Sequence, residues 1–410
     1  VAVGFQSLLA NTCGKYNTAS GYKAMCKNTT GCQNAAHGAE ALFNNTTGCF
    51  NTAVGGVALY SNTTACNNTA VGYRSQVNTT TGHSNAAFGT CSLYTNTTGY
   101  RNNAFGLFAL RLNTTGFIND AFGYSTLKSN TTGCNNAAFG SYSLCSNTSG
   151  KYNTSSGYYS SLKNTTGCFN TAHGAYALRE NTTAKFNTAV GACSLYANTT
   201  GANNTAVGYQ ALKTNECSND NVAVGTYALC LTTGHSNVAV GKSAVQGNTT
   251  GTQNTGVGKF ALAANTTASY NTGIGMCAGY TNTTGTWNTA IGYASFMSNT
   301  TGSYNTASGM YALRNNQTGC RNTATGVRAL GANTTGLYNT ATGTCSLYAN
   351  TGGHNNVATG FQASKSNTTG CYTSALGSYA LCGNTTGCYN TATGYQALFT
   401  NTTASCNTAA

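Results

Sequence analysis

One stretch of sequence decides the fold: Asn51-Thr-Ala-Val-Gly55-Gly-Val-Ala-Leu59-Tyr60. The phrase returns with a 17-residue period and small changes, and an idealised copy reads G-Y-x-A-L-x-x-N-T-T-G-x-x-N-T-A-V. Its glycine keeps this period from Gly4 to Gly225, arrives one position early at Gly241, and keeps the period again to Gly394. The 410 residues therefore form a single continuous array, 1–410, of 24 copies with a one-residue deletion near 226–241.

We number each copy from the residue after this glycine, so that the glycine itself is position 17. It is present in every copy, and position 13 is Asn in every copy except Thr373. Position 15 is nearly always Ala, position 3 is almost always Ala or Ser, and position 4 is mostly Leu. Position 10 is usually Gly but accepts Ala, so the turn there does not require a left-handed backbone. Positions 1, 2, 5, 11 and 12 vary freely and carry most of the aromatic and basic residues.

So short a unit cannot enclose a core of its own, and each copy must therefore bury its apolar face against its neighbours. Asn, Thr and Gly are poor in helix interiors. Collagen needs Gly at every third residue together with Pro, and this chain has no Pro. The pattern predicts an all-β, rod-shaped parallel β-solenoid or β-roll of about 24 coils, one per copy.

The fixed positions predict how a coil is built. We expect a strand region from position 13 to position 5 of the next copy, as in 51–60, with a tight corner at the glycine. Asn at position 13 should form a ladder in which each amide bonds the amide one coil away. The Asn-Thr-Thr-Gly segment should form a turn. The predicted ladder and corner residues include Asn51, Asn68, Asn204, Asn390, Gly55, Gly72, Gly208 and Gly394.

Two copies carry a resemblance to known repeats, Asn204-Thr-Ala-Val-Gly-Tyr-Gln-Ala-Leu212 and Asn390-Thr-Ala-Thr-Gly-Tyr-Gln-Ala-Leu398. They resemble the repeats of tail-fibre and adhesin-like shaft proteins, which have the same period. The Asn-x-Ala-x-Gly core is more distantly similar to the coil of trimeric autotransporter adhesin heads, which are left-handed β-rolls. The resemblance implies an extracellular or cell- or virion-surface fibre, with a trimer as one form of self-association. The adhesin-head coil is shorter than the copy found here, and 19 Cys is unusual for such fibres.

Composition excludes several classes of protein. Only 6% of the residues are charged, and no apolar run is long enough for a membrane-spanning helix. The formal net charge is +13, but the 18 Lys and Arg are scattered singly, whereas nucleic-acid binding concentrates them on one face. The sequence begins and ends inside a copy, without visible caps, so we expect it to be part of a longer chain or filament.

No residue cluster indicates an enzyme, a metal site or a cofactor. Of the five acids, only Glu216 and Asp220 share a coil, and we interpret that coil as a local irregularity rather than a catalytic pair. The histidines lie on widely separated coils, whereas a metal needs several ligands converging on one ion. The five acids are Glu40, Asp120, Glu180, Glu216 and Asp220, and the five histidines are His37, His83, His173, His235 and His354.

Basic residues favour position 5 and would form a sparse stripe along the solenoid. The stripe can either attract anionic glycans or merely keep a nearly uncharged rod soluble, and we favour solubility. Its members are Arg111, Lys128, Arg179, Lys213, Arg314 and Lys365. A Thr-rich solenoid also raises ice binding, but Thr columns at the adjacent positions 8 and 9 of a strand would point to opposite sides.

Asn-x-Thr/Ser sequons recur at position 7, either as glycan acceptors or simply as turn residues. Coils about 4.8 Å apart would crowd N-glycans, whereas partial occupancy or small O-linked sugars on Thr would fit. The candidate glycosylation sites are Asn28, Asn45, Asn62, Asn96, Asn113, Asn130, Asn164, Asn181, Asn198, Asn248, Asn265, Asn282, Asn299, Asn333, Asn367, Asn384 and Asn401.

The 19 cysteines favour an oxidising, extracellular compartment. Neighbours in the position-11 column would have Cα atoms close enough for a disulfide. Four interpretations stay open: bridges along the column, bridges within a coil, free thiols, and disulfides that join neighbouring subunits. The column pairs are Cys32–Cys49 (or Cys49–Cys66) and Cys371–Cys388, and the pairs within a coil are Cys26–Cys32 and Cys382–Cys388.

The sequence as a whole predicts a non-enzymatic structural fibre, filament or appendage shaft that self-associates and carries no cofactor other than covalent glycans. The alternative is an adhesin or phage-type tail-fibre shaft whose exposed aromatic and basic columns bind surface glycans. An ice-binding solenoid is a further alternative.

Overall fold

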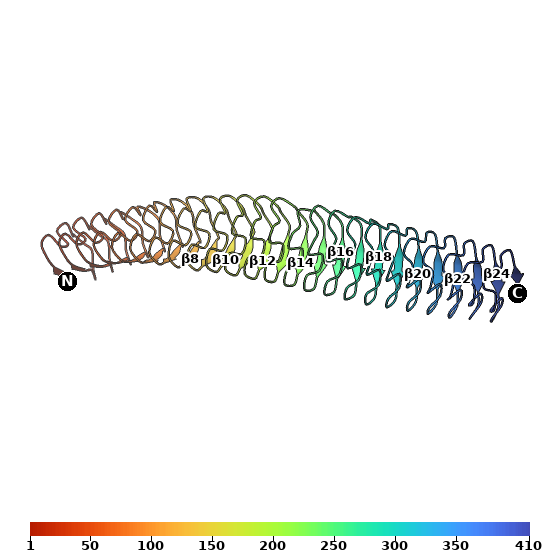
Figure 1. The fold of residues 1–410 in the computed structure, drawn as a ribbon. Coiled ribbons are helices and arrows are strands. Elements are labelled where there is room, and N and C mark those ends of the chain that lie inside the picture. The colour runs from red at the N-terminus through yellow and green to blue at the C-terminus, as the bar shows by residue number, and fades with distance from the viewer. The chain divides into compact units, whose positions relative to one another are not determined.

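The computed structural model describes every residue from Val1 to Ala410, and its only regular elements are β-strands. The chain divides into two compact units, Val1–Asn204 and Thr205–Ala410. Each unit is a stack of coils with one short strand per coil, and the strands of neighbouring coils lie side by side (Figure 1). The predicted parallel β-solenoid is thereby confirmed. The structure contains no helix of the length and apolarity that a membrane crossing requires.

In the first unit each strand pairs in parallel with the strand of the next coil, in order along the chain. The pairing is in register, so that Ala53 faces Ala70. The strands are β1 (Ala2–Val3), β2 (Thr18–Ser20), β3 (Ala35–His37), β4 (Thr52–Val54), β5 (Thr69–Val71), β6 (Ala86–Phe88), β7 (Asn103–Phe105), β8 (Asp120–Phe122), β9 (Ala137–Phe139), β10 (Thr154–Ser156), β11 (Thr171–His173) and β12 (Thr188–Val190).

The second unit repeats this arrangement. Its short coil, 226–241, keeps the register, since Val222 pairs with Val238, and the missing residue is absorbed in the turn near 231–234. The strands are β13 (Thr205–Val207), β14 (Val222–Val224), β15 (Val238–Val240), β16 (Thr255–Val257), β17 (Thr272–Ile274), β18 (Thr289–Ile291), β19 (Thr306–Ser308), β20 (Thr323–Thr325), β21 (Thr340–Thr342), β22 (Val357–Thr359), β23 (Ser374–Leu376), β24 (Thr391–Thr393) and β25 (Thr408–Ala409).

The strand is shorter than predicted. We expected it over 51–60, but β4 ends at Val54, and positions 1 to 6 of the next copy form a run of turns. Val57 and Leu59, at positions 2 and 4, have φ of 54° and 50°, the left-handed region that L-residues rarely adopt. Ala58 and Leu59 are both fully buried, whereas a strand would place neighbours on opposite faces. The turn therefore brings two consecutive side chains into the core.

These turns still satisfy their backbone groups through the neighbouring coils. Val57 N–H donates to the carbonyl of Ala39 at 2.9 Å on one side, and Leu59 N–H donates to the carbonyl of Ser75 at 3.0 Å on the other. The partners lie one coil away, so hydrogen bonds run along the stack even where no strand exists. The core between strand and turn is thin and consists mainly of Ala at positions 15 and 3 and Leu at position 4.

The predicted ladder at position 13 is present. Asn51 Nδ2 donates to Asn34 Oδ1 at 3.1 Å and to the carbonyl of Ala65 at 2.8 Å, and Asn51 N–H donates to the same Asn34 Oδ1 at 2.9 Å. Asn51, Asn68, Asn204 and Asn390 are all fully buried. A buried amide is retained because its donors and acceptor are matched by the amides of adjacent coils.

The corner glycine is required for two reasons. Gly55 and Gly208 have φ of 124° and 132°, where a side chain is strained. A Cβ on Gly55 would also lie 2.7 Å from the carbonyl carbon of Gly72, and one on Gly208 would lie equally close to Gly225. The invariance of position 17 therefore reflects both the backbone conformation and the close approach of the next coil.

A second asparagine ladder runs through position 7, which we had interpreted only as a turn or sequon position. Asn45 Nδ2 donates to Asn28 Oδ1 at 2.7 Å and to the carbonyl of Gly48 at 3.0 Å. The same two contacts recur on most coils of both units, with interruptions at Thr79 and Thr232. Most coils are thus joined to the next by two buried amide ladders as well as by their backbone.

Candidate functional site

The position-7 asparagines are poor glycan acceptors in the folded coil. Both N–H bonds of the Asn45 amide are used in the ladder, and an N-linked sugar would replace one of them inside the stack. An N-glycan at any of these buried side chains would therefore have to break a rung of the ladder. The buried candidate sites are Asn28, Asn45, Asn62, Asn96, Asn113, Asn130, Asn164, Asn181, Asn198, Asn248, Asn265, Asn282, Asn299, Asn333, Asn367 and Asn384. Asn401 is only partly buried, but its amide makes the same two contacts.

The threonine columns at positions 8 and 9 lie in the Asn-Thr-Thr-Gly turn, as predicted, so the alternation of a strand does not apply to them. Thr46, at position 8, donates its hydroxyl to the carbonyl of Thr63 on the next coil at 3.1 Å. Thr47, at position 9, is exposed. Of these two columns, only the position-9 hydroxyls are therefore presented to solvent.

All 19 cysteines are free thiols in the structure, which corresponds to one of the interpretations left open by the sequence; they include the bridge candidates Cys26, Cys32, Cys49, Cys371, Cys382 and Cys388. Column neighbours do touch, but through a different bond: Cys32 N–H donates to Cys49 Sγ at 3.1 Å, and Cys371 N–H donates to Cys388 Sγ at 3.2 Å. Burial raises the pKa of the Cys382 thiol above its usual value, which disfavours the reactive thiolate.

Acidic and histidine side chains do not converge anywhere. The structure contains no group of three or more His, Cys, Asp or Glu that could hold a metal ion. Glu180 forms two salt bridges, 2.5 Å from Lys163 Nζ and 3.1 Å from Arg179 on the basic stripe. These contacts join neighbouring surface side chains and form no cleft.

Aromatic side chains in the variable columns stack on one another. Phe88, Phe105, Phe122 and Phe139, at position 16 of successive coils, have ring centroids 4.7 to 5.1 Å apart and nearly parallel planes. Tyr270 and Trp287, at position 12, stack at 4.1 Å. Within such a stack the ring faces cover each other, so mainly ring edges face solvent.

Each unit has a hollow in the surface formed by positions 1 to 6. In the first unit, a groove of about 310 Å³ opens beside Gly56, which leaves position 1 without a side chain. We call this hollow the tyrosine groove. It is lined by Tyr60, Tyr73 and Tyr94 together with Ala39, Glu40, Gly56, Val57, Arg74 and Val77.

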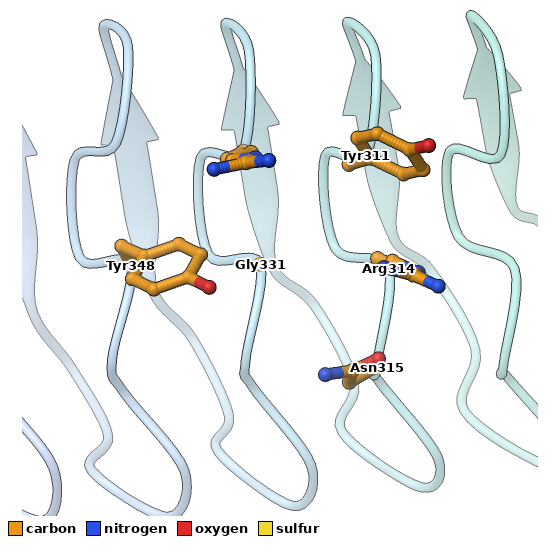
Figure 2. A pocket seen from close by; sticks show the side chains of 6 residues that line it. Tyr311, Arg314, Asn315, Gly331 and Tyr348 are labelled. Atoms are coloured by element: carbon orange, nitrogen blue, oxygen red, sulfur yellow. The ribbon is translucent and has the colours of Figure 1, made fainter.

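In the second unit, a smaller hollow of about 120 Å³ opens at Gly331, where position 5 has no side chain. We call it the arginine notch. Figure 2 shows Arg314 on one side of Gly331 and Tyr348 on the other, on the flanking coils. Tyr311, Asn315 and Arg328 complete the lining. The guanidinium of Arg314 lies 4.8 Å from the ring centroid of Tyr311, which restricts its orientation.

Both hollows were missed in the sequence, although a signal exists. Each follows from a glycine in a column that otherwise carries a side chain, Gly56 at position 1 and Gly331 at position 5. Of the basic stripe that we predicted at position 5, Arg314 lies in the notch, whereas Arg179 is paired with Glu180. Glycine occurs only once at position 1 and only once at position 5, and these two glycines mark the two places.

The geometry thus offers two surface hollows on an otherwise repetitive framework. No protein-family model and no curated protein matches this sequence.

Proposed function

We propose that the chain is a non-enzymatic structural element, the shaft of an extracellular fibre, filament or appendage. The observation that carries the proposal is the use of the fixed positions. Asn at 7 and 13, Gly at 17, Ala at 3 and 15 and Leu at 4 all join one coil to the next or fill the thin core. None of them faces solvent in a common site.

The energetics of such a stack suit a load-bearing element. Every coil adds strand pairing and turn hydrogen bonds to its neighbour, most coils add two amide ladders as well, and stability in repeat proteins grows with these nearest-neighbour terms. The outward columns vary between copies, as expected where only solubility or lateral packing constrains them. The resemblance to tail-fibre and adhesin-like repeats supports a location outside the cell or on a virion. There, copies of the chain would associate with one another.

Electron microscopy of the purified chain tests this proposal. We expect elongated particles that resist protease and that associate further as concentration rises. Compact particles, or a digest that leaves no protected fragment, would contradict it. A matched variant with Leu at two buried ladder positions, Asn119→Leu and Asn136→Leu, should lose protease resistance around residues 110–145 and shows whether the ladders are responsible.

The tyrosine groove favours a second candidate, an adhesive shaft that binds surface glycans. Three tyrosines, a carboxylate and a guanidinium around one hollow combine apolar rings with hydrogen-bonding groups, as sugar-binding sites do. A glycan array with the full chain tests it. Binding that is lost in Tyr73→Ala and kept in Tyr16→Ala, an exposed tyrosine of the same unit outside the groove, supports this candidate, and identical profiles exclude the groove.

A further inference from the structure

The arginine notch contains two guanidinium groups that no carboxylate neutralises. Arg314 and Arg328 belong to consecutive coils, and both line the hollow at Gly331. Glu180, which pairs with Lys163 and Arg179, lies in the other unit. The sequence contains no Asp or Glu after Asp220. Any counter-charge for the notch must therefore come from outside this segment of the chain.

The notch has the size of one anionic group. Its volume of about 120 Å³ corresponds to roughly four water molecules. A side chain at position 331 would compete for this space, because a Cβ there would already lie 3.1 Å from the ring of Tyr348. The glycine thus keeps the hollow open between the Arg314 guanidinium and the Tyr348 ring.

The chemistry of the lining selects an oxyanion. Guanidinium groups bind carboxylates and sulfates through paired N–H donors, and the Asn315 amide adds a further donor at the rim. The Tyr348 ring, 37% exposed, provides an apolar wall on the opposite side. A sugar that carries a carboxylate or sulfate matches both walls, since it combines an anionic group with an apolar C–H face.

A polymeric ligand fits better than a small one. The notch is open to solvent, so a single oxyanion would be held weakly and screened by salt. Lys365 lies in the same column as Arg314, three coils further on, a distance of roughly 14 Å along the stack. A chain of acidic sugars can reach both cations, and each additional contact raises the effective concentration for the next.

A nucleic acid is the less suitable polyanion. Its binding is driven by many phosphate contacts. The segment after Asp220 offers only six cations spread over its length: Lys242, Lys259, Arg314, Arg321, Arg328 and Lys365. We propose that the arginine notch is a binding site for the carboxylate or sulfate groups of an acidic polysaccharide. The proposal is independent of the shaft function.

Calorimetric titration of the full chain at low salt tests the site, with polygalacturonate and dextran sulfate as probes and neutral dextran as the reference polymer. We expect one of the two acidic polymers to bind and dextran not to bind. The polymer that binds more tightly identifies carboxylate or sulfate as the preferred group. Arg314→Gln and Arg328→Gln should each weaken binding about tenfold or more, since each removes a charge-assisted contact.

Two further variants separate the site from general charge attraction. Gly331→Leu keeps every charge but fills the notch, and it should weaken binding as much as the loss of one arginine. Arg101→Gln removes an exposed arginine of the other unit and should change affinity less than about twofold. Equal weakening by Arg101→Gln and Arg314→Gln would overturn the proposal, as would unchanged binding in Gly331→Leu. Tighter binding of single-stranded RNA than of either polysaccharide would also overturn it.

Discussion

Replacing Thr79 by Asn should stabilise the first unit, because it repairs a break in the position-7 ladder. Asn62 Oδ1 is buried and has no hydrogen-bond partner, since Thr79 on the next coil has no amide to donate. On the other side, Asn96 Nδ2 donates to the carbonyl of Gly99 at 3.0 Å, but its contact along the ladder is a long one, 3.5 Å to the Thr79 hydroxyl. An asparagine at 79 would donate to Asn62 Oδ1 and accept from Asn96 Nδ2, as the intact rung between Asn45 and Asn28 does at 2.7 Å.

The magnitude follows from these two contacts. Pairing a buried orphan acceptor recovers about 1–3 kcal/mol, and a well-formed hydrogen bond in place of the long contact adds about 0.5–1.5 kcal/mol. We expect a gain of about 2–3 kcal/mol in the free energy of local opening. Thr79→Val, which has nearly the shape of Thr but cannot donate or accept, is the matched control and should be neutral or slightly destabilising.

Hydrogen exchange followed by mass spectrometry is the appropriate assay, because long repeat arrays do not unfold in one cooperative step. Peptides covering residues 59–100 should exchange about 30-fold or more slowly in Thr79→Asn, while peptides of the second unit stay unchanged. Exchange at the wild-type rate or faster in these peptides would refute the ladder reasoning. Thr373→Asn offers the same test in the position-13 column. There the Asn390 amide bonds Asn384 and Ala404 but not Thr373, and the repair should slow exchange around 385–395.

Three further predictions follow from features of single columns. Gly208→Val should destabilise the second unit by several kcal/mol, through its φ of 132° and its contact with Gly225, whereas Ala202→Val at a variable position should be nearly neutral in thermal unfolding. Burial raises the pKa of the Cys145 thiol, so iodoacetamide at about pH 8.5 should label Cys145 more slowly than the exposed Cys13 in a peptide map, and equal labelling of the two would contradict the raised pKa. Because the folded pKa lies above the unfolded one, the associated stability is present below the unfolded pKa and is lost as pH rises through the folded pKa. Phe105→Ala removes two ring stacks, of 4.7 and 4.8 Å, and should cost about 1–3 kcal/mol together with a loss of near-ultraviolet circular dichroism; an unchanged spectrum would show that the stack is not ordered in solution.

Periodicity predicted the architecture because the same few residues must solve the same packing problem in every coil. Asn51 and Gly55 could be assigned to a ladder and a corner from their invariance alone. The extent of the strand could not, because Val57 and Leu59 adopt a left-handed backbone that nothing in their residue types indicates. A closer clue was present in Ala58-Leu59, where two adjacent fixed apolar positions do not fit the alternation of a strand.

The candidate sites were harder to predict than the fold. The sequence around Asn45 fits a glycosylation sequon and a ladder position equally well, and only the burial of its side chain in the structure favours the ladder. The sequence correctly placed Cys32 and Cys49 on adjacent coils, but in the structure the Cys49 sulfur accepts a hydrogen bond from the backbone N–H of Cys32. The two hollows depend on side chains that are missing, at Gly56 and Gly331. Such places are hard to see in a sequence because the residues around them look ordinary.

The direction of the hydrogen bonds between coils determines how each unit responds to force. Strand pairs, turn amides and both asparagine ladders all point along the stack, so tension on the chain at one end of a unit loads the bonds of only the outermost coil. That coil separates from the stack before the next one is strained, and each detachment releases one 17-residue coil, roughly 60 Å of fully extended chain. A unit pulled in this way lengthens in a series of similar steps and dissipates work at each one. Its toughness therefore grows with the number of coils, while the force it resists stays that of a single coil.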